Sequence, residues 1–313
     1  MRRFRIVLFM LAAAALATNL AWAANAYVTN QLADSLSVVD LSSARVSHTI
    51  GVAAKPAGVA VCGDEIIISH PDSHQISVID RLAAQVKRTF TFGKGPIGIA
   101  CGAPGFVFVS DWYAHSVSEV ALADGMLKAQ VAVGQSPSGI LFDAGKNFIY
   151  VANRESNSIS VVNWSTKQLI KTIGVGKAPF GLAWQGHWLA SANVQASTVS
   201  LIDTEHYRVV HTIATGKLPY CLVFSPDGKR LYVTDQEDST VSVLDVAAAK
   251  RIAAIKVGAD PEGIDISADG RELYVVNWGD SSLSIIDTTT QKLRATIPLG
   301  AGSRGLGRFV GGD

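Results

Sequence analysis

Cysteine is scarce in this chain of 313 residues, which contains only Cys62, Cys101 and Cys221. Because three is an odd number, at most one internal disulfide can form. The sequence also lacks a C-x-x-C pair, the H-E-x-x-H motif of zinc proteases, a Walker phosphate loop and a G-x-S-x-G nucleophile elbow. No two carboxylates have a spacing within one expected element that suits acid/base catalysis. These absences remove the enzyme classes that carry such motifs and favour a protein that is not an enzyme.

Residues 1–23 contain no acidic residue and differ in composition from the rest of the chain. Arg2, Arg3 and Arg5 form a basic start, an apolar run follows over 6–20, and the Ala-Trp-Ala of 21–23 fits a cleavage site. This order is typical of a secretory signal peptide. The alternative is an uncleaved membrane anchor, which the short apolar run disfavours. We therefore expect a periplasmic or secreted protein with no membrane span, in which residues 24–313 form a single domain.

The mature chain carries little net charge. Removal of residues 1–23 takes away three of the 27 basic residues and none of the 26 acidic ones, so 24 against 26 leaves a net charge of −2. This balance argues against nucleic acid or an anionic membrane as the main partner. With 48% hydrophobic and 17% charged residues, the chain has ample material for a large buried core.

The sequence repeats itself with a period of about forty residues. One polar position recurs at steps of 40, 41, 42, 40, 42 and 42, at Asn30, His70, Asp111, Asn153, Asn193, Asp235 and Asn277. A serine follows seven residues later in every copy, at Ser37, Ser77, Ser118, Ser160, Ser200, Ser242 and Ser284. A proline marks six copies, at Pro56, Pro96, Pro137, Pro179, Pro219 and Pro261, and Ser303 takes its place in the seventh. Seven copies fill the mature chain.

Each copy contains four β-like runs and no helical periodicity. In the copy that begins at Pro219, the runs are 221–224, 230–234, 240–244 and 251–257, and the Ser-Pro-Asp-Gly of 225–228 supplies a tight hairpin. Four short antiparallel strands per forty residues are typical of a propeller blade. The sequence therefore predicts an all-β, seven-bladed β-propeller with four antiparallel strands in each blade.

The phase of the repeat predicts how the ring closes. The mature chain starts at a second strand, 27–30, and ends with a segment that resembles a first strand, 305–310. We therefore expect the C-terminal strand to complete the N-terminal blade. Cys62 and Cys101 lie at nearly matching ends of neighbouring first strands, so they could form the one possible disulfide.

The segments AYVTN, IYVAN, LYVTD and LYVVN, with connectors such as GVGKAPFG and VGADPEG, resemble the YVTN family of bacterial β-propeller repeats. The resemblance covers residues 24–310. It implies the propeller fold, and it implies a binding or interaction protein more often than an enzyme. Some family members resemble components associated with quinoprotein-dependent oxidation, which implies, as an alternative, a cofactor-handling or enzymatic accessory of redox metabolism with its site at the channel mouth. The resemblance names no cofactor.

The connectors before each proline and the loops after each YVTN segment should lie on one face, because both follow the same end of antiparallel strands. His70, His74, Asp111 and His115 fall on this face in adjacent copies and could bind a transition metal. The Asn or Asp at this position in the other copies, at Asn30, Asn153, Asn193, Asp235 and Asn277, is expected to be structural and to bond the turn that it starts. Equivalent positions in neighbouring blades also diverge away from the axis, which disfavours a shared metal.

Cations and aromatics in the connectors suggest a small-ligand site at the channel mouth. The candidates are Lys94, Lys177, Phe180, Lys217, Tyr220 and Arg304. Together they could bind an anionic or aromatic ligand through charge-assisted hydrogen bonds and stacking. The alternative is that the lysines are solvated loop charges, since several carboxylates share the face.

Trp112, Tyr113 and Trp278 lie in the loops after the YVTN segments, where the repeat does not require an aromatic residue. Exposed aromatics of this kind anchor protein partners, although these three could instead fold back onto neighbouring loops. The function predicted from the sequence is therefore a binding or scaffolding protein that uses its loop-bearing face. A monomer is expected, because a closed propeller has no free sheet edge that requires a partner.

Signal-peptide cleavage is directly testable. We expect the exported protein to begin at Ala24 and to be recovered from the soluble periplasmic or extracellular fraction. Intact-mass spectrometry with N-terminal sequencing checks this expectation. A membrane-bound protein that retains Arg2, Arg3 and Arg5 would contradict it.

Overall fold

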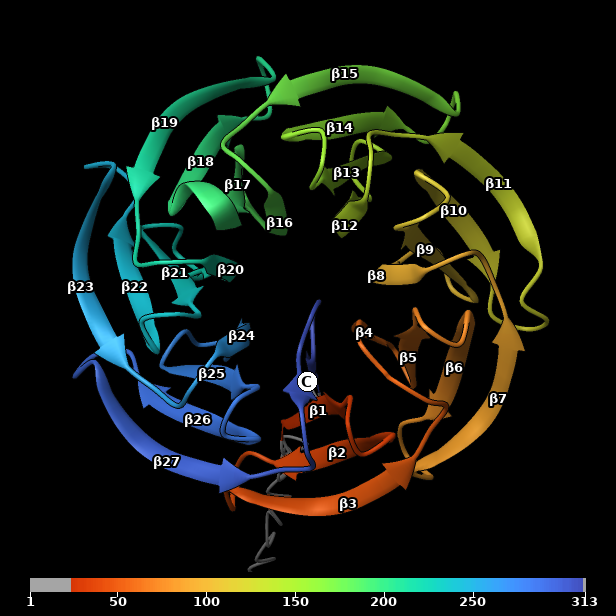
Figure 1. The fold of residues 1–313 in the computed structure, drawn as a ribbon, viewed down its shortest axis with the longest axis horizontal. Helices are drawn as coiled ribbons and strands as arrows, with labels where there is room; N and C mark the ends of the chain where they lie inside the picture. The colour runs from red at the N-terminus through yellow and green to blue at the C-terminus, as the bar shows by residue number, and fades with distance from the viewer. Residues whose placement is uncertain (1–23, 312–313) are drawn as a thin grey trace, which may run out of the picture.

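The computed structural model describes residues 24–311, which form seven antiparallel sheets around one axis (Figure 1). Six sheets have four strands, and the seventh has three strands together with two short C-terminal ones. The predicted seven-bladed β-propeller is therefore confirmed. The signal-peptide prediction concerns residues 1–23 and lies outside the described residues. Within 24–311, no helix is long and apolar enough to cross a membrane.

The strands succeed one another from the axis outward in each blade, which we number 1 to 7 from the N-terminus. The inner strands of blades 2–7 are β4 (Val59–Cys62), β8 (Pro96–Cys101), β12 (Pro137–Asp143), β16 (Pro179–Gln185), β20 (Pro219–Phe224) and β24 (Pro261–Ile266). The second strands are β1 (Asn25–Asn30), β5 (Glu65–His70), β9 (Phe106–Asp111), β13 (Phe148–Asn153), β17 (Trp188–Asn193), β21 (Arg230–Asp235) and β25 (Glu272–Asn277). The third strands are β2 (Ser35–Asp40), β6 (Gln75–Asp80), β10 (Ser116–Ala121), β14 (Ser158–Asn163), β18 (Thr198–Asp203), β22 (Thr240–Asp245) and β26 (Ser282–Asp287). The outer strands are β3 (Arg45–Gly51), β7 (Gln85–Thr91), β11 (Leu127–Ala132), β15 (Gln168–Gly174), β19 (Arg208–Ala214), β23 (Lys250–Lys256) and β27 (Lys292–Pro298). A 3-10 turn, η1 (Val194–Ala196), follows β17.

Burial explains why the middle strands are nearly continuous apolar runs. The second and third strands are covered by neighbouring blades on both faces, so almost every residue in them is buried. The outer strands mix charged and apolar residues and are largely exposed. In blade 6 the hairpin between β20 and β21 closes with the Gly228 amide donating to the Ser225 carbonyl (2.8 Å), with Gly228 at φ 70°. That conformation favours glycine, as the Ser-Pro-Asp-Gly sequence predicts.

The inner strands approach one another so closely that glycine is needed two residues after the connector proline. A Cβ atom added at Gly58, Gly98 or Gly139 would clash with a carbonyl oxygen of the next inner strand. Hydroxyl groups of the second strands cross the same gap, since Ser110 Oγ donates to the Ser138 carbonyl of the next blade (2.6 Å) and Thr29 Oγ1 to that of Ala57 (3.0 Å). Adjacent blades are therefore joined by hydrogen bonds as well as by apolar packing.

The ring closes as the repeat phase predicts. The short strands β28 (Ser303–Arg304) and β29 (Val310–Gly311) both pair antiparallel with β1. The amides of Phe309 and Val310 donate to Asp265 Oδ2 on β24 (3.2 and 3.0 Å), and the Val59 amide of blade 2 donates to the Leu306 carbonyl (2.9 Å). The closing segment is thus bonded to the blades on both of its sides. Its Phe309 side chain is fully buried in the core of blade 1.

The disulfide that the sequence left open is present. Cys62 and Cys101 are bonded, with their Cα atoms 5.5 Å apart, and they join the inner strands of blades 2 and 3 at the end of the channel remote from the connectors. The remaining cysteine, Cys221, is a buried free thiol whose pKa is raised by burial. Cys221 lies two residues after the connector proline of blade 6, at the position that is glycine in the other six blades.

Ring closure predicts a large effect of the C-terminal segment on stability. Phe309→Ala should lower the free energy of unfolding by about 3–5 kcal/mol, because it leaves a cavity in the core of blade 1. Deletion of residues 302–313 should cost more, because it also removes the backbone bonds to β1 and β4. Urea unfolding measures both, with Tyr113→Ala as a control at an exposed aromatic. A truncated protein that is as stable as the full chain would contradict this closure.

Candidate functional site

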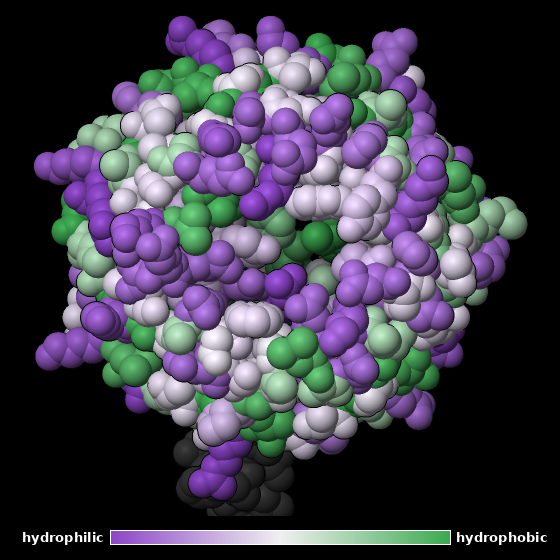
Figure 2. Space-filling view, in the orientation of Figure 1, coloured by the Kyte–Doolittle hydropathy of each residue, from purple (hydrophilic) through white to green (hydrophobic). Residues whose placement is uncertain are grey.

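The connectors and the loops after the second strands share one face of the propeller, here called the loop face. The Trp112 amide donates to the Gly95 carbonyl (2.9 Å), and the Gln31 amide donates to that of Gly302 (2.9 Å), so each loop lies against its connector. Figure 2 shows this face, which is largely hydrophilic and hollowed near its centre. The opposite side, which carries the hairpins between inner and second strands, is here called the hairpin face.

The recurring polar residue that ends each second strand, here called the anchor residue, is engaged in its own blade. Asn30 Nδ2 donates to Ser35 Oγ (3.0 Å) and to Ser37 Oγ (2.9 Å). The same two bonds recur at Asn153, Asn193 and Asn277, and Asp235 accepts both from Thr240 and Ser242. The recurring serine is thus the partner of the anchor residue, and both have a structural role.

His70 takes the anchor position in blade 2. It is fully buried, with Nδ1 donating to the Ala54 carbonyl (3.2 Å) and Nε2 accepting from Ser77 Oγ (2.9 Å). Burial lowers the pKa of His70 to about 4, so the ring is neutral at physiological pH. Ala53 stands in this connector where the other six have glycine against the anchor residue.

The four residues considered for a metal are not brought together as one ligand set. Asp111 Oδ2 accepts from the Lys94 amide (2.7 Å), and His115 Nδ1 accepts from the Ser136 amide (3.2 Å). His74 is exposed at φ 55°, in the left-handed turn that follows His70. Among residues 24–311, the one group of His, Cys, Asp and Glu with ligand atoms within 4.8 Å of one another lies elsewhere.

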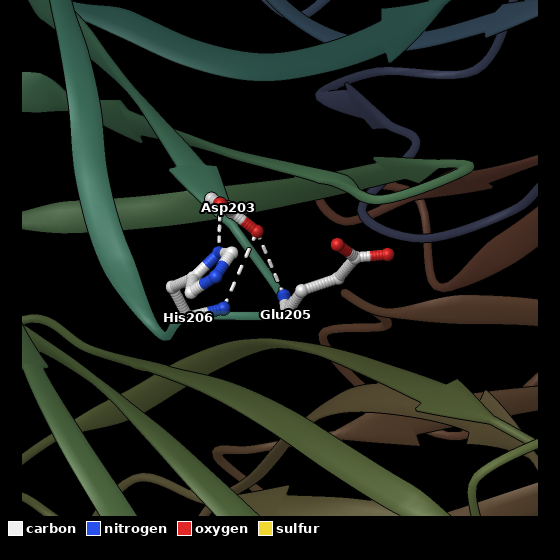
Figure 3. Close-up of side chains that lie close together, drawn as sticks. All are labelled: Asp203, Glu205 and His206. Carbon is white, nitrogen blue, oxygen red and sulfur yellow. Dashed lines mark hydrogen bonds and ion pairs between the residues drawn. The ribbon is translucent and has the colours of Figure 1, made fainter.

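That group is Asp203, Glu205 and His206, in the hairpin between β18 and β19 (Figure 3). Asp203 accepts hydrogen bonds from the Glu205 amide (2.8 Å) and from His206 Nδ1 (2.6 Å). Aspartates at the same position of other blades, such as Asp40 and Asp80, accept the same backbone bonds. The group is therefore a version of a turn that also follows the third strands of other blades, with a histidine added.

Three of the six candidates for the channel mouth do meet near the axis. They lie in a set of residues from blades 4–7 and 1, here called the mouth cluster: Arg154, Phe180, Tyr220, Gln236, Glu262 and Arg304. The Phe180 and Tyr220 rings stack with centroids 4.1 Å apart, and the Arg154 guanidinium lies 5.8 Å from the Phe180 centroid. Such contacts combine dispersion with cation–π attraction.

An ion pair between the buried Glu262 and the partly exposed Arg304 forms the other half of the mouth cluster. Glu262 Oε2 lies 3.3 Å from Arg304 Nε, and Glu262 Oε1 accepts from Gln236 Nε2 (3.1 Å). Burial raises the pKa of Glu262 to about 7, even though Arg304 opposes the shift. Burial likewise raises the pKa of Tyr220, so its hydroxyl stays protonated. The charge of the mouth cluster therefore changes near neutral pH.

The three lysine candidates lie away from this cluster. Lys94, Lys177 and Lys217 are all exposed on the connectors. Lys217 Nζ pairs with Glu237 Oε1 (2.9 Å), and both side chains are more than half exposed. The alternative of solvated loop charge describes them better than a place at the mouth.

The aromatic candidates differ in exposure. Tyr113 is 61% exposed and lies over Gly95. Trp112 is partly buried and, with Ile97, packs against a cluster whose other members come from blades 5–7 and from Leu306. Trp278 is also partly buried. Only Tyr113 of the three is presented to solvent, so the structure does not bring them together as one exposed aromatic patch.

Sequence reasoning missed Glu262, Gln236 and Arg154. Glu262 occupies the position after the connector proline, which is Ala57, Ile97, Ser138, Phe180, Tyr220, Glu262 and Arg304 around the ring. Gln236 and Arg154 directly follow an anchor residue. A comparison of these two positions across the seven copies would have found all three.

A second feature lies on the axis beneath the mouth cluster. A cavity of about 900 Å³ runs between the inner strands toward the hairpin face, where Arg81, Trp184 and Arg308 contribute to its lining. Its walls are mostly apolar side chains and glycine backbone. Its volume is in the range of small-molecule sites.

Burial of His70 predicts one component of the pH dependence of stability. Folding holds His70 neutral down to about pH 4, whereas the unfolded chain takes up a proton at this residue below about pH 6.5, so the contribution of His70 to stability falls as pH drops between these values. The loss should reach about 2–3 kcal/mol at pH 4.5. His70→Asn, which restores the common anchor residue, should abolish this component in urea unfolding. His48→Asn, at an exposed histidine, should retain it, and an equal loss in His70→Asn would contradict the assignment.

Comparison with known proteins agrees with this architecture. The YNCE-like β-propeller family matches residues 117–265. No curated protein sequence matches the chain.

Among solved structures, Kuenenia stuttgartiensis hydrazine synthase has 20% identity over 79% of this chain and 87% of that one, with a TM-score of 0.71. A functionally unknown protein from Desulfotomaculum acetoxidans has 13% identity, covers 89% of this chain and 98% of its own, and has a TM-score of 0.76. The dihydro-heme d1 dehydrogenase NirN, in complex with DHE, has 11% identity over 92% of this chain and 75% of that one, with a TM-score of 0.71.

At these identities the solved structures establish a shared fold. Taken together, the family match, the seven repeats and the closed ring of blades show a seven-bladed β-propeller repeat protein and support its likeness to the YVTN type.

Proposed function

We propose that this protein is an exported, non-catalytic binding protein that recognises its ligand at the mouth cluster of the loop face. The observation that carries the proposal is the Glu262–Arg304 pair beside the stacked Phe180 and Tyr220 rings. Charged groups and a stacked aromatic pair converge there on one side of the channel. Sites that bind small molecules typically combine an apolar wall with a few convergent polar groups.

The fold itself does not require this pair. At the same position, blades 3 and 4 have Ile97 and Ser138, and their inner strands pair in the same way as that of blade 7. A buried ion pair costs desolvation free energy that its attraction often only offsets. Neutral residues fill this position in other blades, so the desolvation cost of the Glu262–Arg304 pair favours a functional role for the pair.

The chemistry of the mouth cluster favours a ligand with an anionic or aromatic group. The cluster contains two guanidinium groups, on Arg154 and Arg304, of which Arg304 lies beside Glu262 and Arg154 lies 3.9 Å from Glu155 Oε1. Guanidinium groups bind carboxylate and phosphate in a two-pronged geometry, and the Phe180 and Tyr220 rings can stack on a planar group. Protonation of Glu262 near pH 7 would release Arg304 to an anionic ligand.

The alternative is an accessory of redox metabolism. Its support is that hydrazine synthase and a dihydro-heme d1 dehydrogenase share the fold. At 20% and 11% identity, this likeness concerns architecture and links no residue of the mouth cluster to their chemistry. We therefore favour the binding function.

Native mass spectrometry tests the proposal on protein purified gently from its own host. The wild type should carry a discrete noncovalent mass, and the double variant Glu262→Gln/Arg304→Gln should lose it, because the charges that hold the ligand are gone. The matched control is Lys217→Gln/Glu237→Gln, which removes an exposed pair on the same face and should keep the mass. A bare wild type, or a mass retained in the first variant, would contradict the proposal.

A further inference from the structure

The central cavity differs in chemistry from the mouth cluster. Its walls come from the middle and far ends of the inner strands, and they include Leu141, Phe142, Leu182, Val223 and Ile266. No residue of the mouth cluster belongs to its lining. The two features therefore occupy successive levels of one channel.

Apolar side chains also reach the open end of the cavity. Trp184, at the end of β16, is 41% exposed, and Phe142 on the neighbouring β12 is partly exposed. Contact between large aromatic side chains and water is unfavourable, so covering these two rings with an apolar group would lower the free energy. An apolar body between the inner strands would cover them.

Two cations lie at the same rim. Arg308 is exposed and, among the residues that the structure describes, has no ion-pair partner. The Arg81 side chain is 17% exposed, its Nε is buried without a hydrogen-bond acceptor, and its one carboxylate neighbour, Asp64, is 78% exposed and 3.7 Å away. Lys229 and Arg271 of this face also lie 3.7 Å from a carboxylate, that of Asp227 and that of Asp269, and all four of these side chains are more than half exposed.

The one carboxylate in the cavity lining, that of Asp265, already accepts hydrogen bonds from the backbone. Asp265 is buried and accepts the amides of Phe309 and Val310, which fixes the closing strand. Its charge is thus directed to the backbone, although Arg308 lies near enough to favour its ionised form. The rim therefore retains two guanidinium groups that an anion could engage.

We propose that this cavity is a second binding site, for a molecule with an apolar body and one anionic group such as a carboxylate. The body lies between the inner strands, against Phe142 and Trp184. The anion lies at the hairpin face and accepts charge-assisted hydrogen bonds from Arg81 and Arg308. This site is separate from the mouth cluster and does not depend on the function proposed for it.

The test compares acids with their neutral amides on the full mature protein. Decanoate and 2-naphthoate are titrated by calorimetry against decanamide and 2-naphthamide, which have the same apolar bodies. Each acid that fits should bind about tenfold or more tightly than its amide, because a hydrogen bond to a charged group is worth more than one to a neutral group. The better of the two acids shows whether the body is aliphatic or aromatic.

Variants assign the effect to the rim. In Arg81→Gln/Arg308→Gln, the affinity for the acid should fall to that for the amide, whereas Lys229→Gln/Arg271→Gln should leave it unchanged. If loss of Arg81 impairs folding, Arg308→Gln alone carries the test. Quenching of tryptophan fluorescence by the acid should disappear in Trp184→Phe. Equal binding of acid and amide, no binding of either acid, or unchanged binding in the arginine variants would overturn the proposal.

Discussion

The close approach of seven inner strands around one axis is the constraint on which the rest of the structure depends. Glycine at positions such as Gly58 and Gly98 permits it, because any side chain there would clash with the next strand. Hydroxyl groups such as that of Ser110 then bond one blade to the next. The closing segment around Phe309 completes the ring by bonding to the blades beside it. With the strands so fixed, the residue after each connector proline contributes to the loop-face end of the channel in every blade.

Regular and irregular positions of the repeat therefore have different roles. The anchor residues, their serines and the glycines recur because the same packing and hydrogen-bonding requirements apply in every blade. The residues that follow the prolines vary from Ala57 to Glu262 and Arg304, and their variety is concentrated where seven copies meet. Variation at the axis changes the chemistry of the channel without changing the blades. This separation explains how one architecture can present a charged mouth above an apolar cavity.

Most of the fold could be predicted from the sequence, because its rules are local and are repeated seven times. The strands of blade 6 were placed to within two residues, and the phase of the repeat gave the closure through 305–310. The possible Cys62–Cys101 bond followed from matching positions in adjacent copies. The site was predicted less well. Phe180, Tyr220 and Arg304 were identified, but Lys94, Lys177 and Lys217 lie on the exposed rim, because a shift of three residues along a connector moves a side chain from the axis to solvent. Glu262 was missed because its pairing with Arg304 and Gln236 joins residues from three different blades.

The central claim is that the charged pair at the mouth serves binding and not folding. The most direct test replaces the pair with residues that other blades carry at the same position, as Glu262→Ile/Arg304→Ala, and measures the free energy of unfolding in urea. The prediction is a free energy that is unchanged or higher, because apolar replacements of buried ion pairs are often neutral or stabilising by about 1–4 kcal/mol. A loss of about 3 kcal/mol or more would contradict the claim and assign Glu262 and Arg304 to the maintenance of the ring.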